Sequence, residues 1–297
     1  MTIKSSVGSR IFDILNYTFM IIMMAITVYP FLNVFAISVS GHYYVSSGMV
    51  GIIPKGFNIE MYKLLLRTEE VLISYKNTVL YAAVGTAIML FLNSIYAYTL
   101  SKPDLPAKGI ITVYLAVTMF FSGGLIPTYL TIRALGGINT FWVMVLPFSV
   151  SAWTIIVMRT FFQGIPYSLT ESALMDGAGE LAILSRLIIP LSKPLYATMA
   201  LFAVVGIWNS WFNAIIYLTD NYKWPIQAIL RHISVIGKIL TKESNNDALR
   251  QAAAEANIIP QSYKYAMMMI VIIPIVALYP FFQRYFIKGV MIGAIKG

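Results

Sequence analysis

One polar stretch between two apolar runs carries the residue types that suit contact with another molecule. It reads Glu-Ser-Ala-Leu-Met-Asp-Gly-Ala over residues 171–178, and Pro190 follows it. The stretch is too polar and too rich in small residues to be buried in lipid. Its small side chains, which include Ala173, Gly177 and Ala178, would let the backbone of a partner approach closely.

The local spacing in this stretch predicts a short helix with defined ends. Ser168 and Glu171 have the S-x-x-E spacing of a capping box, so we expect the helix to begin at Ser168 and Glu171 to hydrogen-bond its own helix start. Gly177 suits a left-handed cap at the helix end. A second short helix, from Glu180 to Ile189, is expected before Pro190 breaks it. One side of that helix would carry Leu181, Leu184, Leu187 and Ile188.

The composition predicts an all-α, polytopic membrane protein that forms a single transmembrane domain over residues 1–297. Of the 297 residues, 59% are hydrophobic and 11% are charged, whereas soluble domains have about 25% charged residues. The apolar residues form runs of about 20, which match the thickness of the hydrocarbon core. We expect six spans, at about 12–36, 76–99, 109–130, 140–162, 194–218 and 265–287.

The loop charges predict the orientation of these spans. Six spans place both termini on one side, and short basic loops favour the cytoplasmic side. The polar loop 163–193 then faces the cytoplasm, as does a C-terminal tail over residues 288–297. The first span is expected to be an uncleaved helix. The net charge of +9 suits anionic lipid headgroups, and no basic-aromatic patch suggests nucleic acid.

The sequence lacks the residues that several classes of function require. No Asp, Glu, Lys or Arg lies in the middle of an expected span, which disfavours ion-coupled transport. There is no GxxxxGK[ST], HExxH or GxSxG motif and no cysteine, and the two histidines lie in different loops. We therefore expect no catalytic residue, no metal site and no cofactor on this chain. A transporter of this composition takes its energy from another polypeptide.

The polar loop resembles the EAA loop of binding-protein-dependent ABC importer permeases, in which an acid, a glycine and a proline are fixed points. Glu171, Gly177 and Pro190 fall on that spacing. The resemblance continues in residues 159–166, which look like the R-x-F-F-x-x-I-P lead-in of carbohydrate permeases, and in Trp-Asn-Ser-Trp-Phe at 208–212. Residues 283–297 are similar to the tail of the maltose-type second permease subunit. The first half resembles permeases for complex or polysaccharide-derived oligosaccharides.

This resemblance implies a type I ABC importer permease in a bacterial cell membrane. It implies a heterodimer with a second, homologous permease, two ATPase subunits that hold ATP and Mg, an extracytoplasmic solute-binding protein, and an oligosaccharide as substrate. The loop would be the coupling helix that docks on an ATPase, through Glu171, Ser172, Ala173, Asp176, Gly177, Ala178 and Pro190. The tail would also contact the ATPases, through Lys288, Gly289, Gly293, Lys296 and Gly297. The tail could alternatively be a basic anchor on anionic lipid.

Aromatic and amide side chains mark candidate contacts with sugar. Trp208 and Trp211 are expected to share one face of a helix, and Asn209 and Asn213 another. Further candidates are Asn93, Tyr96 and Ser122. The alternative for the tryptophans is an interfacial belt.

Three other functions stay open. An ABC permease for an amino acid or a polyamine would carry the same loop, but the tail and the Trp-Asn motif favour sugar. A membrane scaffold could bind a soluble partner through the loop. An intramembrane enzyme would need a catalytic dyad or a metal set, and the sequence shows neither.

Overall fold

The computed structural model describes residues 7–242 and 261–294, and within these ranges it contains helices and no β-strand. The chain divides into two compact units. One unit contains α1 (Val7–Ser38), α2 (His42–Ser46) and α3 (Glu60–Leu65). The other begins at Glu69 and contains every helix from α4 to α12. The boundaries between the units fall inside α13 (Ile226–Lys242) and α15 (Gln261–Ala294).

Three helices are long and apolar enough to cross a membrane, which confirms a membrane-embedded chain. They run over Gly8–Ser38, Glu69–Ser101 and Gln261–Phe281. Three more candidates are bent pairs of shorter helices, so the described residues offer three to six spans. Nearly all apolar side chains of α1 are exposed within its unit, as suits contact with lipid.

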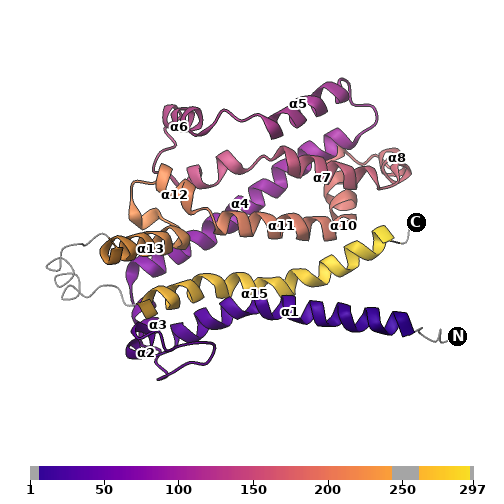
Figure 1. Cartoon of the computed structure of the whole chain (residues 1–297). Coiled ribbons are helices and arrows are strands. Elements are labelled where there is room, and N and C mark those ends of the chain that lie inside the picture. Colours follow the sequence, from indigo (N-terminus) through magenta and orange to yellow (C-terminus); the bar gives the residue numbers. More distant parts are fainter. Residues whose placement is uncertain (1–6, 243–260, 295–297) are drawn as a thin grey trace. The chain divides into compact units, whose positions relative to one another are not determined.

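The second unit is built around α4 (Glu69–Ser101), against which α7 (Ala152–Gln163) and α11 (Lys193–Trp208) pack (Figure 1). The helices approach closely at Gly85, where an added Cβ would lie 2.6 Å from the Cδ1 atom of Ile207, so that the end of the Ile207 side chain would have to shift. Two apolar clusters surround α4. One contains Ala97, Ile155, Met158 and Met199, and the other contains Tyr81, Val143, Ala214 and Tyr217.

Each predicted span between the second and the sixth is interrupted in the structure. The third consists of α5 (Lys108–Phe120) and α6 (Leu125–Ala134), which meet at 111°. The chain turns there because Gly124 has a φ of +81°, which glycine adopts at no steric cost. The fourth begins with the 3₁₀ turns η1 (Phe141–Met144) and η2 (Leu146–Phe148), and these meet α7 at 51°.

The segment between α7 and α11 consists of short helices. They are α8 (Tyr167–Met175), α9 (Glu180–Ile183), the π-helical η3 (Leu184–Ile188) and α10 (Ile189–Leu191). The last three form one continuous rod that meets α11 at 86°. After α11, the chain continues into α12 (Trp211–Tyr217) and the 3₁₀ turn η4 (Asn221–Lys223).

Hydrogen bonds from α4 hold the chain at two levels. Near its start, Asn77 donates to the carbonyl of Tyr222, and the Thr78 hydroxyl accepts from the N–H of Ile226. Near its end, the hydroxyl of Tyr98 donates to Glu180. At 1.5 Å per residue, these levels are about 30 Å apart, close to the thickness of the hydrocarbon core. In Figure 1, α8 accordingly lies near one end of α4, and α12 lies towards the other.

The sequence placed a tail after residue 287, but the helix α15 continues to Ala294. Lys288, Gly289 and Gly293 therefore belong to its last turns. Lys296 and Gly297 lie outside the described residues. The physical reason for the longer helix is that residues 283–294 contain no proline, and the two glycines lower helix propensity without forcing an end.

Candidate functional site

The helix α8 begins one residue earlier than the sequence predicted. Pro166 stands at its N-cap with φ −55° and ψ 123°, and no side chain caps the helix. The helix begins at Tyr167, so Ser168 lies in its first turn and not at the N-cap. The predicted capping box was therefore wrong. Glu171 lies in the second turn, is exposed, and accepts no hydrogen bond within the described part of the chain.

The end of α8 has the left-handed cap that the sequence predicted. Gly177 has a φ of +79°. The N–H of Gly177 donates to the carbonyl of Leu174 at 3.0 Å, and that of Ala178 donates to the carbonyl of Ala173 at 2.9 Å. These two bonds form a Schellman motif. The turn therefore rests on a glycine in a conformation that other residues adopt only under strain.

The turn and the two helices that flank it enclose a hollow of about 610 Å³. Five of the predicted coupling residues line it, namely Ser172, Ala173, Asp176, Gly177 and Ala178. Glu171 and Pro190 do not line it. No added Cβ on Gly177 or Gly179 would meet an atom within 4 Å, so the mouth of the turn is open. The hollow can receive the backbone or a side chain of another protein.

The two helices that flank this hollow, α8 and α9, each carry a strongly exposed apolar side chain. Met175 is 89% exposed and Leu181 is 70% exposed. The sequence placed Leu181 on the same face as Leu184 and Ile188, but Ile183 takes that place and is 1% exposed. The physical reason is the π turn in η3, which changes the register of the helix. Leu181 therefore points away from the core.

Pro190 does not end the second helix, in contrast to the prediction. The rod continues to Leu191 and turns at the fully buried Ser192. Pro190 has no N–H to donate to the preceding turn, and the π geometry of residues 184–188 precedes it directly. Pro194 then stands at the start of α11. The two prolines flank the 86° bend.

Glu180, which sequence reasoning missed, anchors the turn to the core. Its carboxylate forms an ion pair with Lys102 and accepts a hydrogen bond of 2.7 Å from the hydroxyl of Tyr98. The ammonium of Lys102 also lies 5.2 Å from the centroid of the Tyr98 ring. The bonds from Lys102 and Tyr98 lower the pKa of the Glu180 carboxyl. The sequence does contain a signal for this ion pair: Glu180 falls in the first turn of one helix, and Lys102 follows directly after another.

The expected pairing of tryptophans in the fifth span was wrong. The helix α11 ends at Trp208, and α12 begins at Trp211. Trp208 is 4% exposed and its ring meets that of Tyr75 edge-on, with centroids 5.8 Å apart. Asn209 is exposed at the junction, and Trp211 and Asn213 are half-buried on α12. The break at 209–210 separates the faces that an unbroken helix would have joined.

Asn93 has a structural role, because its side-chain amide bonds the backbone of a neighbouring segment. It is fully buried, and its amide donates to the carbonyl of Ser149 at 2.7 Å and accepts from the N–H of Ser151 at 3.0 Å. The side chain thus satisfies the backbone at the break between η2 and α7, which argues against contact with sugar. Tyr96 is exposed on α4, and Ser122 is exposed in the bend of the third span. The structure does not bring these two together with Asn213.

A cleft of about 390 Å³ in the second unit has the residue types that bind sugars, and sequence reasoning missed most of it. It lies between α4, η2, α7 and α11. The rings of Trp153 and Phe202 line it with their centroids 6.0 Å apart, and Phe148 joins them. Its polar lining comes from Ser151, Thr154, Ser210 and Asn213. Of the predicted sugar contacts, Asn213 alone lines this cleft.

Comparisons with known proteins agree with this architecture. No family model matches the chain. Protein LplC of Bacillus subtilis is 36% identical over 296 residues, which are 100% of this chain and 98% of LplC. The polygalacturonan/rhamnogalacturonan transport system permease protein YtcP of Bacillus subtilis is 36% identical over 289 residues, which are 97% of this chain and 99% of YtcP.

A solved structure gives the same result. A chain of a bacterial ABC transporter that imports the acidic polysaccharide alginate superposes with a TM-score of 0.85 and 31% identity. The match covers 96% of this chain and 100% of that one. The fold and the relatives define an integral membrane subunit of the ABC importer class. The chain belongs to the sugar permeases of ABC transporters.

Proposed function

We propose that this permease is one half of the translocation path of an ATP-driven oligosaccharide importer in a bacterial cell membrane. A second, homologous permease completes the path as a heterodimer. A solute-binding protein delivers the sugar from outside. The names of YtcP and of the alginate importer support a substrate derived from a polysaccharide.

In this proposal the hollow beside Gly177 is the docking site for an ATPase. The observation that carries it is an open hollow, lined by Ser172, Ala173 and Gly177, whose far side is bonded to α4 through Glu180. Small residues admit a partner's helix, and the bond to α4 connects the docking turn with the helix at the centre of the unit. Two ATPase subunits supply ATP hydrolysis and hold ATP and Mg, and this chain binds no cofactor.

The same proposal assigns the two ends of α4 to the two sides of the membrane. The end near Glu180, both termini and the tail over 288–297 face the cytoplasm. The level of Asn77 and Tyr222, about 30 Å away along the helix, faces outward. The sugar passes along the cleft lined by Trp153 and Phe202, where aromatic faces and hydroxyl groups suit a pyranose.

Reconstitution tests this function. The chain is purified with the second permease and the ATPase and placed in proteoliposomes with the solute-binding protein. We expect ATP hydrolysis to rise when the binding protein is loaded with an oligosaccharide, together with uptake of that sugar. A complex stimulated only by an amino acid or a polyamine would show a permease for another solute. If the chain did not purify with an ATPase, it would instead be a membrane scaffold.

A further inference from the structure

Two side-chain contacts join the start of α13 to the junction of α11 and α12, all within the second unit. The amide of Gln227 donates to Oδ1 of Asn209 at 2.8 Å. The guanidinium of Arg231 lies over the ring of Trp211, 5.0 Å from its centroid. Gln227 and Arg231 are four residues apart and therefore lie on the same face of the helix. The contacts form a polar ladder beside the segment that supplies Ser210 and Asn213 to the cleft.

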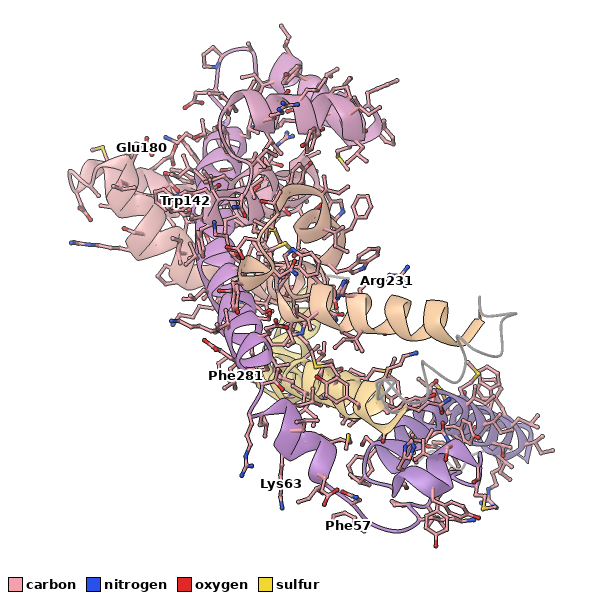
Figure 2. All side chains as sticks on the ribbon, turned by 90° about the vertical axis from the view of Figure 1, so that its left-hand side faces the viewer. Phe57, Lys63, Trp142, Glu180, Arg231 and Phe281 are labelled. Atoms are coloured by element: carbon pink, nitrogen blue, oxygen red, sulfur yellow. The ribbon has the colours of Figure 1, made fainter. Side chains whose placement is uncertain are left out.

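Arg231 keeps its hydrogen-bonding edge unused in this arrangement. The side chain is exposed (Figure 2). A cation–π contact does not require any of the five N–H donors of the guanidinium. None of these donors meets an acceptor among the side chains and backbone groups that the structure describes, and no ion pair of Arg231 occurs among them. The contact with the Trp211 ring favours this position of the guanidinium.

The remaining groups of the ladder suit a carbohydrate. Gln227 retains the oxygen of its amide as an acceptor for a hydroxyl group. Asp220, the acid in the turn between α12 and α13, accepts from the N–H of Tyr222 and thus caps its own turn. The ladder therefore presents a cation and an amide, and its one charge is positive. A planar carboxylate is the acceptor that a guanidinium binds in a bidentate manner.

We propose that Arg231, supported by Trp211 and Gln227, binds the carboxylate of an acidic sugar at the end of the second unit opposite Glu180. The inference rests on the proposed function and specifies its substrate class as oligosaccharides that contain uronic acid. Arg231 supplies a bidentate ion pair to the carboxylate, and Gln227 bonds a neighbouring hydroxyl. Neutral oligosaccharides of the same size lack the group that Arg231 recognises.

The test measures sugar binding to the complete transporter complex in detergent, without the solute-binding protein, so that its selectivity does not enter. The probes are a trigalacturonate and the same trisaccharide with its carboxyl groups reduced to alcohols. We expect the wild type to bind the acidic probe at least tenfold more tightly. Arg231→Gln should remove this preference and leave binding of the reduced probe within twofold. Arg231→Lys keeps the positive charge but loses the bidentate geometry of the guanidinium, so it should retain part of the preference for the acidic probe.

Arg133→Gln is the matched control, because Arg133 is an exposed arginine in the last turn of α6. It should keep the full preference. Equal binding of both probes by the wild type, or no binding of either, would overturn the proposal. So would an Arg231→Gln variant that keeps the preference but associates more weakly with the binding protein, since Arg231 would then dock protein. Uptake of any oligosaccharide in proteoliposomes would leave the proposed function intact in these cases.

Discussion

The hydroxyl of Tyr98 donates to Oε2 of Glu180 across 2.7 Å, and this bond joins the last turns of α4 to the first turn of α9. Lys102, one turn further along, pairs with the same carboxylate. The two contacts fix the start of the second short helix and with it one wall of the hollow beside Gly177. The docking turn is thus connected through side chains to the helix against which α7 and α11 pack.

Glu180→Gln should weaken this anchor without unfolding the protein. The Lys102 and Glu180 side chains are 27% and 52% exposed, so the pair contributes about 1 kcal/mol or less. We expect a small loss of thermal stability and a larger loss of sugar-stimulated ATP hydrolysis, because the turn is no longer held in position. Lys102→Gln should have the same effect, and the double variant should be no worse than either single one. Fully additive losses would contradict a shared anchor.

The pH dependence of stability gives a second measure of this anchor. The pKa of Glu180 is lowered from 4.5 in the folded protein, so its contribution is present above about pH 4.5 and is lost as the pH falls through the folded pKa. The difference in unfolding free energy between wild type and Glu180→Gln should be constant from pH 6 to 8. It should shrink below about pH 4.5. If the difference in unfolding free energy stayed constant below about pH 4.5, this result would argue against an ionised pair of Glu180 and Lys102.

Glu171→Lys should block association with the ATPase and leave folding unchanged. Glu171 is exposed and makes no hydrogen bond within the described residues, so the reversed charge removes no contact of the folded chain. Pull-down of the ATPase and thermal stability are measured together. The control is Glu70→Lys, an exposed acid in the first turn of α4, which should associate normally. Normal sugar uptake by the Glu171→Lys variant would show that Glu171 is not part of the docking site.

Gly177→Val should fail through backbone strain. Gly177 has a φ of +79°, and a left-handed conformation costs a residue with a side chain about 1–2 kcal/mol, more for a β-branched one. We expect loss of the assembled complex on size exclusion. Gly179→Ala is the control, since Gly179 has an ordinary φ of −72° and open space around it. Wild-type assembly and ATP hydrolysis in Gly177→Val would show that the turn tolerates another conformation.

Asn93→Leu should destabilise the second unit. It would leave the buried carbonyl of Ser149 and the half-buried N–H of Ser151 without the partner they share, at a cost of about 1–3 kcal/mol for the buried carbonyl. Thermal unfolding in detergent measures this loss. Tyr96→Ala, on the exposed side of the same helix, should change stability far less. Equal stability of Asn93→Leu and wild type would refute the structural role of the amide.

Deletion of residues 288–297 should leave the protein in the membrane and reduce sugar-stimulated ATP hydrolysis. Gly289 and Gly293 are four residues apart on α15, so they lie on one side of the helix and admit close packing against a partner. The measurement is hydrolysis in proteoliposomes with and without anionic lipid. If only the dependence on anionic lipid changed, the segment would be a lipid anchor and not an ATPase contact.

The sequence alone determined the features that depend on composition and on local backbone chemistry. Long apolar runs predicted the helices α1, α4 and α15, because the hydrocarbon core sets their length. Gly177 was predicted to be a left-handed cap from its place at the expected end of a short helix, and its φ is +79°. The motif around Glu171 identified the family, which the relatives confirm. Each of these signals is contained in a few neighbouring residues or in their average polarity.

Only the tertiary structure decided which side chains meet. Trp208 and Trp211 have helical spacing, yet a break between α11 and α12 separates them. Asn93 has the chemistry of a sugar ligand, yet it serves the backbone at residues 149–151. Glu180 and Tyr98 are 82 positions apart, and so no local pattern pairs them. Such contacts depend on how the helices pack, and packing is fixed by the sum of many apolar contacts rather than by the spacing of any one motif.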